Sequence, residues 1–313
     1  MSRQFLLAVG AGALAALFYV AVGLGSFGSL ILAYLAQLPL FAIGLGAGFH
    51  HALLASGIGA VLIAAALPLS AAGLFLLTAA LPVLVLTNRA LLSRTRPDGV
   101  VEWYPPGHLV AILNGMALAA LIAAALVFWG QEGGMVGAAR ELLAEMMRGP
   151  LVGGLSEQAV AAAQHRLAWF LPALVLSSWQ IMVMVNGMLA QGVLSRFSLN
   201  IRPGAPFREL WLPQWLSIAL AAALVASFVP GRIGDLGGNA AIVAALPFVF
   251  LGLSVIHALS VRWPARIFVL ICVYLALFVA GWPAVIVAAI GFLETWLSLR
   301  ERFSRGRSQD EEE

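Results

Sequence analysis

Apolar residues fill most of this chain in stretches of membrane-spanning length, and short polar loops separate the stretches. The hydrocarbon core of a bilayer is about 30 Å thick, so a helix needs about 20 mostly apolar residues to cross it. The pattern predicts an all-α, polytopic membrane helix bundle of eight to ten spans. The candidate spans are 5–24, 29–48, 52–67, 71–88, 109–129, 167–191, 212–229, 240–260, 266–281 and 284–299.

Four of these candidates are short and form two neighbouring pairs. The pair 52–67 and 71–88 is joined at Leu67-Pro68, and the pair 266–281 and 284–299 is joined at Gly281-Trp282-Pro283. Proline cannot continue a helical hydrogen-bond ladder, so both joints are suitable turning points. Each pair is therefore either two tilted spans or a partly re-entrant hairpin.

Small residues recur at helical spacing on the first two spans. Ala8, Gly12 and Ala16 do so on the first span, and Gly44 and Gly48 do so on the second. Small side chains let two membrane helices approach closely, so we expect these faces to be packing faces.

Arginines are shared unequally between alternate loops. If the N-terminus is inside, 13 arginines fall on the inner side and four on the outer side. The inner set is Arg3, Arg89, Arg94, Arg96, Arg196, Arg202, Arg208, Arg262, Arg266, Arg300, Arg302, Arg305 and Arg307, and the outer set is Arg140, Arg148, Arg166 and Arg232. By the positive-inside rule, both termini are predicted to be cytoplasmic. Tryptophans cluster near the predicted span ends, as expected for the interface, except for Trp179 in mid-span.

The domain organisation predicted is one transmembrane helical domain over 1–299, followed by a charged cytoplasmic tail over 300–313. The longest loop, 130–166, is predicted to be external. Within it, 138–148 has the pattern of a helix lying on the interface. Leu142, Leu143, Met146 and Met147 form its apolar face, and Arg140, Glu141, Glu145 and Arg148 form its polar face. This helix is either a lid over an outward cavity or a surface brace, and Ser156 after it is expected to be a helix N-cap.

Composition excludes several kinds of chemistry. Hydrophobic residues make up 62% of the chain and charged residues 10%, against roughly 25% charged in a soluble domain. All 17 basic residues are arginine, so neither a P-loop lysine nor a Schiff-base lysine is possible. Any use of ATP would need another chain. The single cysteine, Cys272, lies in an apolar span and allows no disulfide or thiolate cluster.

Catalytic motifs are also missing. The chain has no Gly-x-Ser-x-Gly elbow and no His-Glu-x-x-His helix, and no predicted span contains an aspartate. His50 and His51 are adjacent, so their side chains point about 100° apart on a helix and would chelate a metal poorly. We predict that the protein is not an enzyme, has no metal site or cofactor, and binds lipid rather than nucleic acid.

A few polar residues lie within the predicted spans and are the candidate substrate-binding residues. They are Gln37, Asn114, Gln180, Asn186, His257 and Glu294. Each is unfavourable in hydrocarbon unless it has a partner, so each is expected to face the bundle interior. Helix–helix hydrogen bonding, at about 0.6–2 kcal/mol per bond, is the alternative to a binding site.

Four of these residues lie at similar depth. Asn114, Asn186, His257 and Glu294 are four to six residues from the predicted cytoplasmic ends of their spans, and Gln37 is nearer mid-depth, as is Gln180. The four form a predicted polar layer roughly 6–9 Å inside the membrane. Glu294 is the only acidic residue in a span, so it either belongs to a site or pairs at the interface with an arginine such as Arg300.

Three segments carry a family resemblance. They are Leu38-Pro39-Leu40-Phe41 with Gly44, Leu45 and Gly48, then Phe207-Arg208-Glu209-Leu210-Trp211-Leu212-Pro213, and Gly291-Phe292-Leu293-Glu294-Thr295-Trp296 ending at Arg300 and Arg302. In these segments the chain resembles the YybS-like family of bacterial multi-pass membrane proteins, a domain of unknown function. That family is distantly similar to the substrate-binding components of energy-coupling-factor transporters.

The resemblance implies a small-molecule-binding bundle that relies on separate ATPase and coupling subunits. We therefore expect a transporter-like component of the bacterial cytoplasmic (inner) membrane without an ATPase of its own. The alternative is a structural or scaffold membrane protein of envelope assembly, with envelope proteins as its partners.

Overall fold

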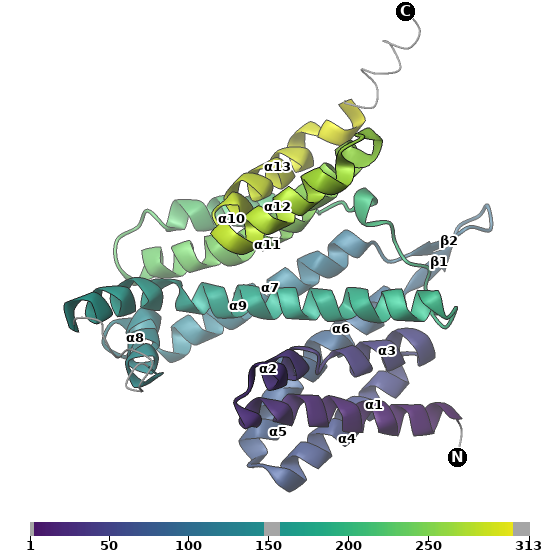
Figure 1. Ribbon diagram of the computed structural model, residues 1–313, viewed down its shortest axis with the longest axis horizontal. Coiled ribbons are helices and arrows are strands. Elements are labelled where there is room, and N and C mark those ends of the chain that lie inside the picture. Colours follow the sequence, from purple (N-terminus) through teal and green to yellow (C-terminus); the bar gives the residue numbers. More distant parts are fainter. Residues whose placement is uncertain (1–2, 147–156, 303–313) are drawn as a thin grey trace, which may run out of the picture. The chain divides into compact units, whose positions relative to one another are not determined.

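The computed structural model describes residues 3–146 and 157–302 and is mainly helical (Figure 1). The elements of the first part are α1 (Arg3–Val20), η1 (Ala21–Leu24), α2 (Phe27–Tyr34), α3 (Leu38–Ala47), α4 (Phe49–Ala66), α5 (Leu69–Phe75), η2 (Leu76–Ala80), α6 (Leu81–Ala90), β1 (Ser93–Thr95), β2 (Val101–Trp103) and α7 (Pro106–Val127). The remainder comprises α8 (Gly134–Met146), α9 (Glu157–Arg196), η4 (Phe207–Glu209), α10 (Trp215–Ala226), α11 (Arg232–Leu259), η5 (Ser260–Arg262), α12 (Arg266–Ala280) and α13 (Pro283–Leu297).

Seven helical segments of the described chain are long and apolar enough to cross a membrane. They are Arg3–Leu24, Phe27–Ala47, Phe49–Ala66, Leu69–Ala90, Pro106–Val127, Arg166–Arg196 and Arg232–Leu259. The shorter apolar helices α10, α12 and α13 have 12, 15 and 15 residues. They rise only about 18–22 Å, less than the hydrocarbon thickness. The helical class and the multi-pass membrane character expected from the sequence are therefore confirmed.

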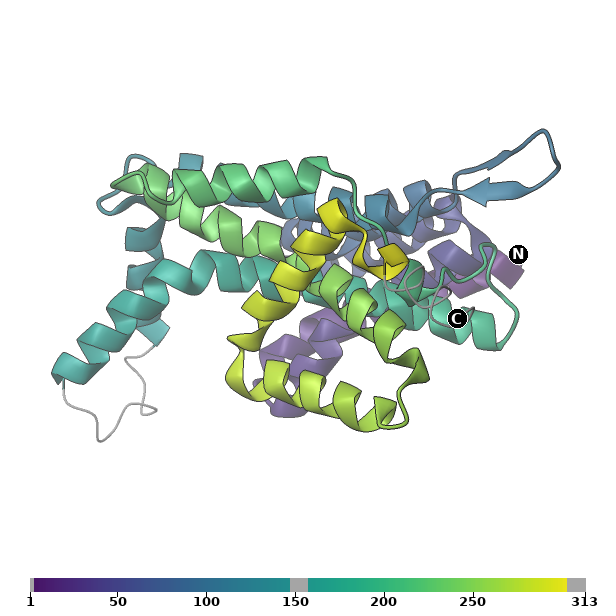
Figure 2. The same ribbon diagram turned by 90° about the horizontal axis from the view of Figure 1, so that it is seen from above.

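A small β-hairpin is the exception to the all-α prediction. β1 and β2 pair in antiparallel register, with Arg94 opposite Glu102. The turn between them contains Asp98-Gly99, in which Gly99 has φ 81°, and the Asp98 side chain accepts a hydrogen bond from the Val100 N–H at 3.1 Å. Pro-Asp-Gly is a recognised turn signal, so the sequence contains a local indication of this hairpin. Figure 2 shows it extending past the helix ends.

The hairpin carries an exposed ion pair. Arg94 Nε lies 2.7 Å from Glu102 Oε2, and this contact lowers the pKa of the Glu102 carboxyl. Because the pair is exposed, it contributes little to stability.

The described chain divides into two compact units by its internal contacts. Unit 1 contains the residues up to Leu113 together with Trp179–Ala205, and unit 2 contains Asn114–Ser178 together with the residues from Pro206. The helices α7 and α9 each have residues in both units.

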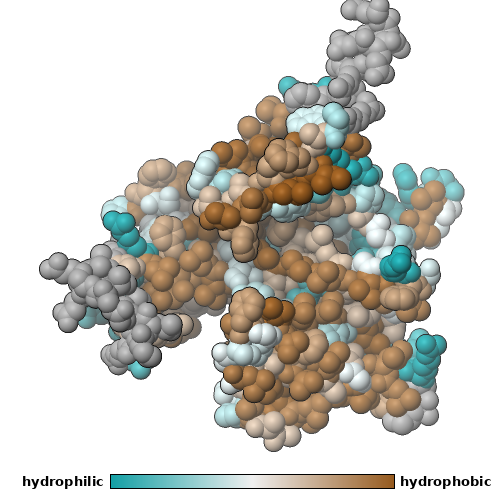
Figure 3. All heavy atoms as spheres, viewed as in Figure 1, coloured by the Kyte–Doolittle hydropathy of each residue, from teal (hydrophilic) through white to brown (hydrophobic). Residues whose placement is uncertain are grey.

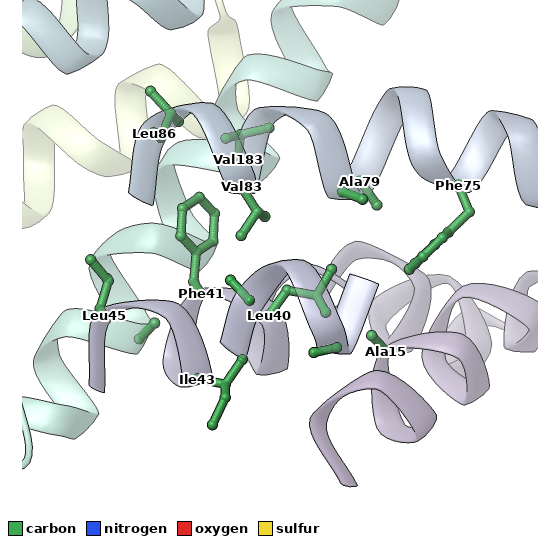
Figure 4. Packing of buried hydrophobic residues seen from close by; sticks show 14 of the residues in the cluster. Ala15, Leu40, Phe41, Ile43, Leu45, Phe75, Ala79, Val83, Leu86 and Val183 are labelled. Carbon is green, nitrogen blue, oxygen red and sulfur yellow. The ribbon is translucent and has the colours of Figure 1, made fainter. Parts of the chain in front are cut away.

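The core of unit 1 lies between α1, α3, α4, α6 and the second half of α9. Figure 4 shows Phe41 of α3 pointing toward Val83 of α6 and Val183 of α9. All three side chains are buried, and Leu40 and Phe75 are fully buried as well. Side chains of this size bury enough apolar area to stabilise the unit by packing.

Two of the predicted small-residue contacts are present in unit 1. A Cβ on Gly12 would meet the carbonyl group of Ala55, and one on Gly44 would meet the side chain of Thr87. Ala8 and Ala16 of the same α1 face are buried. Gly48 has no such neighbour, so the prediction is wrong there. Close helix packing in α1 and α3 therefore depends on the absence of side chains at Gly12 and Gly44.

A polar contact closes the loop that follows α9 in unit 1. Arg202 is buried and donates from Nη1 to the carbonyl oxygen of Ala90, the last residue of α6, at 3.2 Å. A cation at a helix C-terminus is favourable because it meets the negative end of the helix dipole. Burial lowers the pKa of Arg202, but a guanidinium group stays protonated in proteins.

In unit 2, α11 packs closely on α13. A Cβ on Gly252 would meet the Val287 carbonyl, and one on Gly291 would meet the Phe248 carbonyl. By contrast, α12 has no buried residue, and Phe278 is 90% exposed. Figure 2 shows α12 and α13 diverging from the turn that joins them, and Figure 3 shows that one face of the molecule is largely apolar. Exposed apolar side chains on α12 are what contact with lipid would require.

The predicted interfacial helix is present, but with other bounds and another face. α8 begins at Gly134 rather than at residue 138, and its described part ends at Met146. It buries Val136, Ala139 and Leu143 against Ala168 of α9, whereas Leu142 is 55% exposed. The expected N-cap at residue 156 and the tail from residue 303 lie outside the described residues.

Candidate functional site

Proline residues interrupt three of the apolar helical segments. Pro82, Pro172 and Pro247 have no N–H, so the carbonyl group four residues before each loses its usual helical donor. A carbonyl group without a donor is unfavourable in a bilayer, where water cannot replace the missing bond. The structure places polar side chains at all three breaks.

Asn114 supplies the missing donor in α11. Its Nδ2 donates to the carbonyl oxygen of Val243 at 2.8 Å, and Val243 lies four residues before Pro247. The Asn114 side chain is completely buried. This candidate binding residue therefore braces a proline break in unit 2.

Asn239 repairs the break in α9, and sequence reasoning missed it. Its Oδ1 accepts from the Ala173 N–H at 2.9 Å, and its Nδ2 donates to the Trp169 carbonyl at 3.0 Å. These two backbone groups would bond each other in an uninterrupted helix. Asn239 is fully buried but lies one residue before the predicted span 240–260. The predicted span boundary therefore excludes it from the intramembrane polar residues.

The break in unit 1 is a π-turn, η2, centred on Thr78. The carbonyl oxygen of Thr78 lies four residues before Pro82 and accepts from Gln37 Nε2 at 2.9 Å and from Trp179 Nε1 at 2.7 Å. This explains why a tryptophan is found at mid-span, since its indole N–H bonds a carbonyl group that the proline leaves open. π-turns within helices are frequent at functional sites.

The segment 27–47 is interrupted as well. α2 ends at Tyr34 and α3 begins at Leu38. Asn186 of α9 donates from Nδ2 to the Tyr34 carbonyl at 2.7 Å and to the Met182 carbonyl at 2.7 Å. Asn186 therefore holds the open end of α2 against α9 within unit 1.

Gln37, the Thr78 carbonyl and Trp179 share one set of contacts, and Asn186 lies seven residues, or about 10 Å, along α9 from Trp179. We call these four groups the mid-span polar centre of unit 1, after the position of Gln37 and Trp179. A carbonyl oxygen only accepts, so the NH₂ groups of Gln37 and Asn186 must face their carbonyl partners. This fixes the positions of the two amide oxygens. Gln37 Oε1 and Asn186 Oδ1 are buried and have no hydrogen-bond partner among the described residues.

Two further buried polar groups belong to unit 1. Gln180 follows Trp179 directly in α9 and is 2% exposed. The hydroxyl oxygen of Thr87, beside Gly44, is buried and has no hydrogen-bond partner in the part of unit 1 that the structure describes. Buried acceptors are favourable only when a donor or a cation reaches them. The open amide oxygens of Gln37 and Asn186 are therefore acceptors that a ligand N–H or O–H group, an ordered water or a cation would satisfy.

Glu294 is paired with Arg300 in unit 2. Its Oε1 lies 2.7 Å from Arg300 Nε, and its side chain is 6% exposed. Arg300 also donates to the carbonyl oxygens of Arg208 at 2.6 Å and Leu210 at 2.8 Å. This arrangement corresponds to the interfacial pairing that the sequence left as the alternative to a site. It fastens the end of α13 to the loop 206–211.

His257 lies in a different set of contacts. Its Nε2 is 3.0 Å from the Tyr274 hydroxyl of α12, and its ring stands edge-on to Phe207 at 5.7 Å between centroids. Its partners are thus an aromatic hydroxyl and an aromatic ring.

The members of the predicted polar layer are divided between the two units. Asn186 belongs to unit 1, and Asn114, His257 and Glu294 belong to unit 2 with different hydrogen-bond partners. A shared depth for the four therefore stays a prediction. In the described ranges, no group of three or more His, Cys, Asp or Glu residues is placed to hold a metal ion.

Comparison with known proteins gave no relative. No family model, curated protein or solved structure matched the chain. The case for a function consequently depends on the side-chain geometry.

Proposed function

We propose that the protein is a transporter-like, small-molecule-binding component of a membrane system, without an ATPase of its own. The observation that supports this most is the mid-span polar centre of unit 1. There, two interrupted helical segments and α9 contribute Gln37, the Thr78 carbonyl and Asn186. Interrupted helices at mid-membrane are a recurring way to build substrate and ion sites in transporters.

The chemistry of the centre indicates the ligand class. Its open groups are the amide oxygens of Gln37 and Asn186, and none of its residues is an acid. Such oxygens favour a small polar molecule with N–H or O–H donors, or a monovalent cation that several neutral oxygens can surround. Hydrolysis of ATP would come from a separate chain because this one has no lysine for a P-loop. The resemblance to the YybS-like family and to energy-coupling-factor components agrees with this proposal.

A bacterial cytoplasmic membrane location with both termini inside is part of the proposal. Two termini on the same side of the membrane need an even number of crossings. The seven long segments alone give an odd number. α12 and α13 form a pair and leave the parity unchanged, so the short helix α10 decides it. If α10 crosses, the arginine-rich loops all lie on one side, as the positive-inside rule requires.

Reporter fusions test this topology. Alkaline phosphatase fused at Gly133 or Gly231 should be active, and phosphatase fused at Pro203 should be inactive. An inactive fusion at Gly231 would show that α10 does not cross and would place the C-terminus outside.

A second candidate function is a structural or scaffold role in envelope assembly. It is favoured by the use of Asn114 and Asn239, whose hydrogen bonds to backbone groups brace helices. It is also favoured by α12, which has no fully buried residue and leaves much of its apolar surface open to lipid or to a partner helix.

Affinity purification in mild detergent separates the two candidates. Co-purification of ATPase and coupling subunits is the result expected for a transport component. Recovery of envelope-synthesis proteins in place of such subunits would contradict the transport proposal and favour the scaffold. An abundant unrelated multi-pass protein carrying the same tag serves as the control for non-specific capture.

A further inference from the structure

One end of unit 2 combines positive charge with the aromatic residues typical of a membrane interface. Trp211 and Trp263 are 52% and 49% exposed, and they flank η4 and η5 respectively. Indole side chains favour the headgroup level of a bilayer. The end of unit 2 that holds the loop 206–211 and the start of α12 is therefore at headgroup depth.

Two arginines at this end have no acidic partner. Arg300 is neutralised by Glu294, but Arg208 and Arg266 have no ion-pair partner among the described residues. The Nε atom of Arg266 is buried and lacks a hydrogen-bond partner there. Glu209, beside Arg208, is exposed. Two guanidinium groups without an acidic partner favour an anionic ligand, and the N–H fork of a guanidinium group matches the oxygens of a phosphate.

Both arginines lie on elements that contact His257. Phe207, next to Arg208, stands edge-on to the imidazole ring at 5.7 Å between centroids, and the Tyr274 hydroxyl of α12, the helix that begins at Arg266, lies 3.0 Å from its Nε2. Arg300 fixes the backbone here by donating to the Arg208 carbonyl at 2.6 Å. Arg208 and Arg266 are therefore held on the same part of unit 2 although they are 58 residues apart in sequence.

His257 and Tyr274 leave a hydrogen-bond donor at the same place. If Nε2 accepts the Tyr274 hydroxyl proton, the other ring nitrogen carries an N–H; if Nε2 donates, the hydroxyl proton is free. Either way one N–H or O–H remains for a third group. Glycerol-ester carbonyl oxygens of a phospholipid lie just below the phosphate and accept such a donor.

Below these groups, α12 offers an apolar track. Ile267, Ile271 and Phe278 share the face of Tyr274 at helical spacing and are 75%, 58% and 90% exposed. The track begins at Arg266 and continues for about 18 Å along the helix, comparable to the acyl depth of one leaflet. A free phosphate ion would leave this apolar surface unused, whereas a lipid would cover it.

We infer that this end of unit 2 binds one anionic phospholipid, with its phosphate between Arg208 and Arg266 and its acyl chains along α12. The site takes its selectivity from the headgroup charge, and zwitterionic lipids cover α12 less tightly. It is separate from the mid-span polar centre of unit 1, so lipid selectivity and small-molecule binding can fail independently.

Native mass spectrometry of the full-length protein in mild detergent tests the site, with phosphatidylglycerol and phosphatidylcholine as probes. The wild type should retain phosphatidylglycerol preferentially. Arg208→Gln and Arg266→Gln should each weaken that retention about fivefold, and the double variant about 25-fold, because each arginine contributes independently near a charged headgroup. Phosphatidylcholine retention should fall less, because its choline group compensates the charge of its phosphate. Arg94→Gln, on the exposed hairpin, is the matched control.

Equal retention of the two lipids by the wild type would overturn the inference, as would full phosphatidylglycerol retention by the double variant. Inorganic phosphate added at millimolar concentration should not displace the lipid; complete displacement would assign the site to a free anion. The comparison of the two lipids uses only the wild-type protein. It can therefore still contradict the inference if a variant does not fold.

Discussion

Arg300→Gln is expected to be the most destabilising single polar substitution in unit 2, lowering the free energy of unfolding by about 3–5 kcal/mol. The reason is the buried carboxylate of Glu294, whose side chain is 6% exposed and whose charge Arg300 compensates at 2.7 Å. Loss of the guanidinium leaves that charge buried and also removes the donors to the carbonyl groups of Arg208 and Leu210. Thermal unfolding of the detergent-purified protein measures the effect.

Matched variants separate the buried charge from the lost contacts. Glu294→Gln removes the charge and should be milder than Arg300→Gln. The double variant should recover part of the stability lost in Arg300→Gln, because no unpaired carboxylate remains. Arg302→Gln, two residues along and exposed, should be neutral. If Arg300→Gln were as mild as Arg302→Gln, the anchor role of the pair would be wrong.

Asn239→Ala is the second change expected to have a large effect, about 2–3 kcal/mol. The substitution leaves the Ala173 N–H and the Trp169 carbonyl without the side chain that bonds both at the Pro172 break. Pro172→Ala in the same chain should relieve this penalty, because the helix can then close its own hydrogen bond between those two groups. Stabilities of the single and double variants, measured as a double-mutant cycle, check the prediction.

Strong coupling between the two positions is the expected outcome of that cycle. Asn200→Ala serves as the control, because Asn200 donates only to the carbonyl of Arg202 in a loop. Additive effects of Asn239→Ala and Pro172→Ala would show that the asparagine does not act through the proline break.

The helical segments were predictable because their apolar lengths are set by the bilayer. Each predicted span has a helical counterpart in the structure, and the small residues Gly12 and Gly44 are in contact as expected. The interruption at 35–37 was not predicted, because apolar content does not distinguish a continuous helix from a broken one. Its physical reason is visible only in three dimensions, where Asn186 satisfies the Tyr34 carbonyl from 152 residues away.

The candidate residues were partly predictable because the bilayer also constrains polar side chains. Polar groups in a span must be partnered, and Gln37, Asn114 and Asn186 are indeed buried with backbone partners. Their partners could not be read from the sequence, since the bond from Asn114 to Val243 depends on how α7 packs on α11. A local signal was present at two of the breaks: Pro82 and Pro247 each mark the carbonyl four residues earlier, of Thr78 or Val243, as an acceptor in need of a donor.

The mid-span polar centre of unit 1 is expected to bind a small molecule, whereas Asn114 is expected to brace a helix. Mass spectrometry of small molecules retained by the protein in mild detergent tests this most directly, with Gln37→Leu, Asn186→Leu and the brace variant Asn114→Leu compared at equal folded amounts. Gln37→Leu leaves Trp179 bonded to the Thr78 carbonyl at 2.7 Å and so should fold. We predict that the wild type and Asn114→Leu retain the same bound molecule and that Gln37→Leu and Asn186→Leu lose it. Retention of that molecule by folded Gln37→Leu and Asn186→Leu, or no retained molecule in the wild type, would contradict the account.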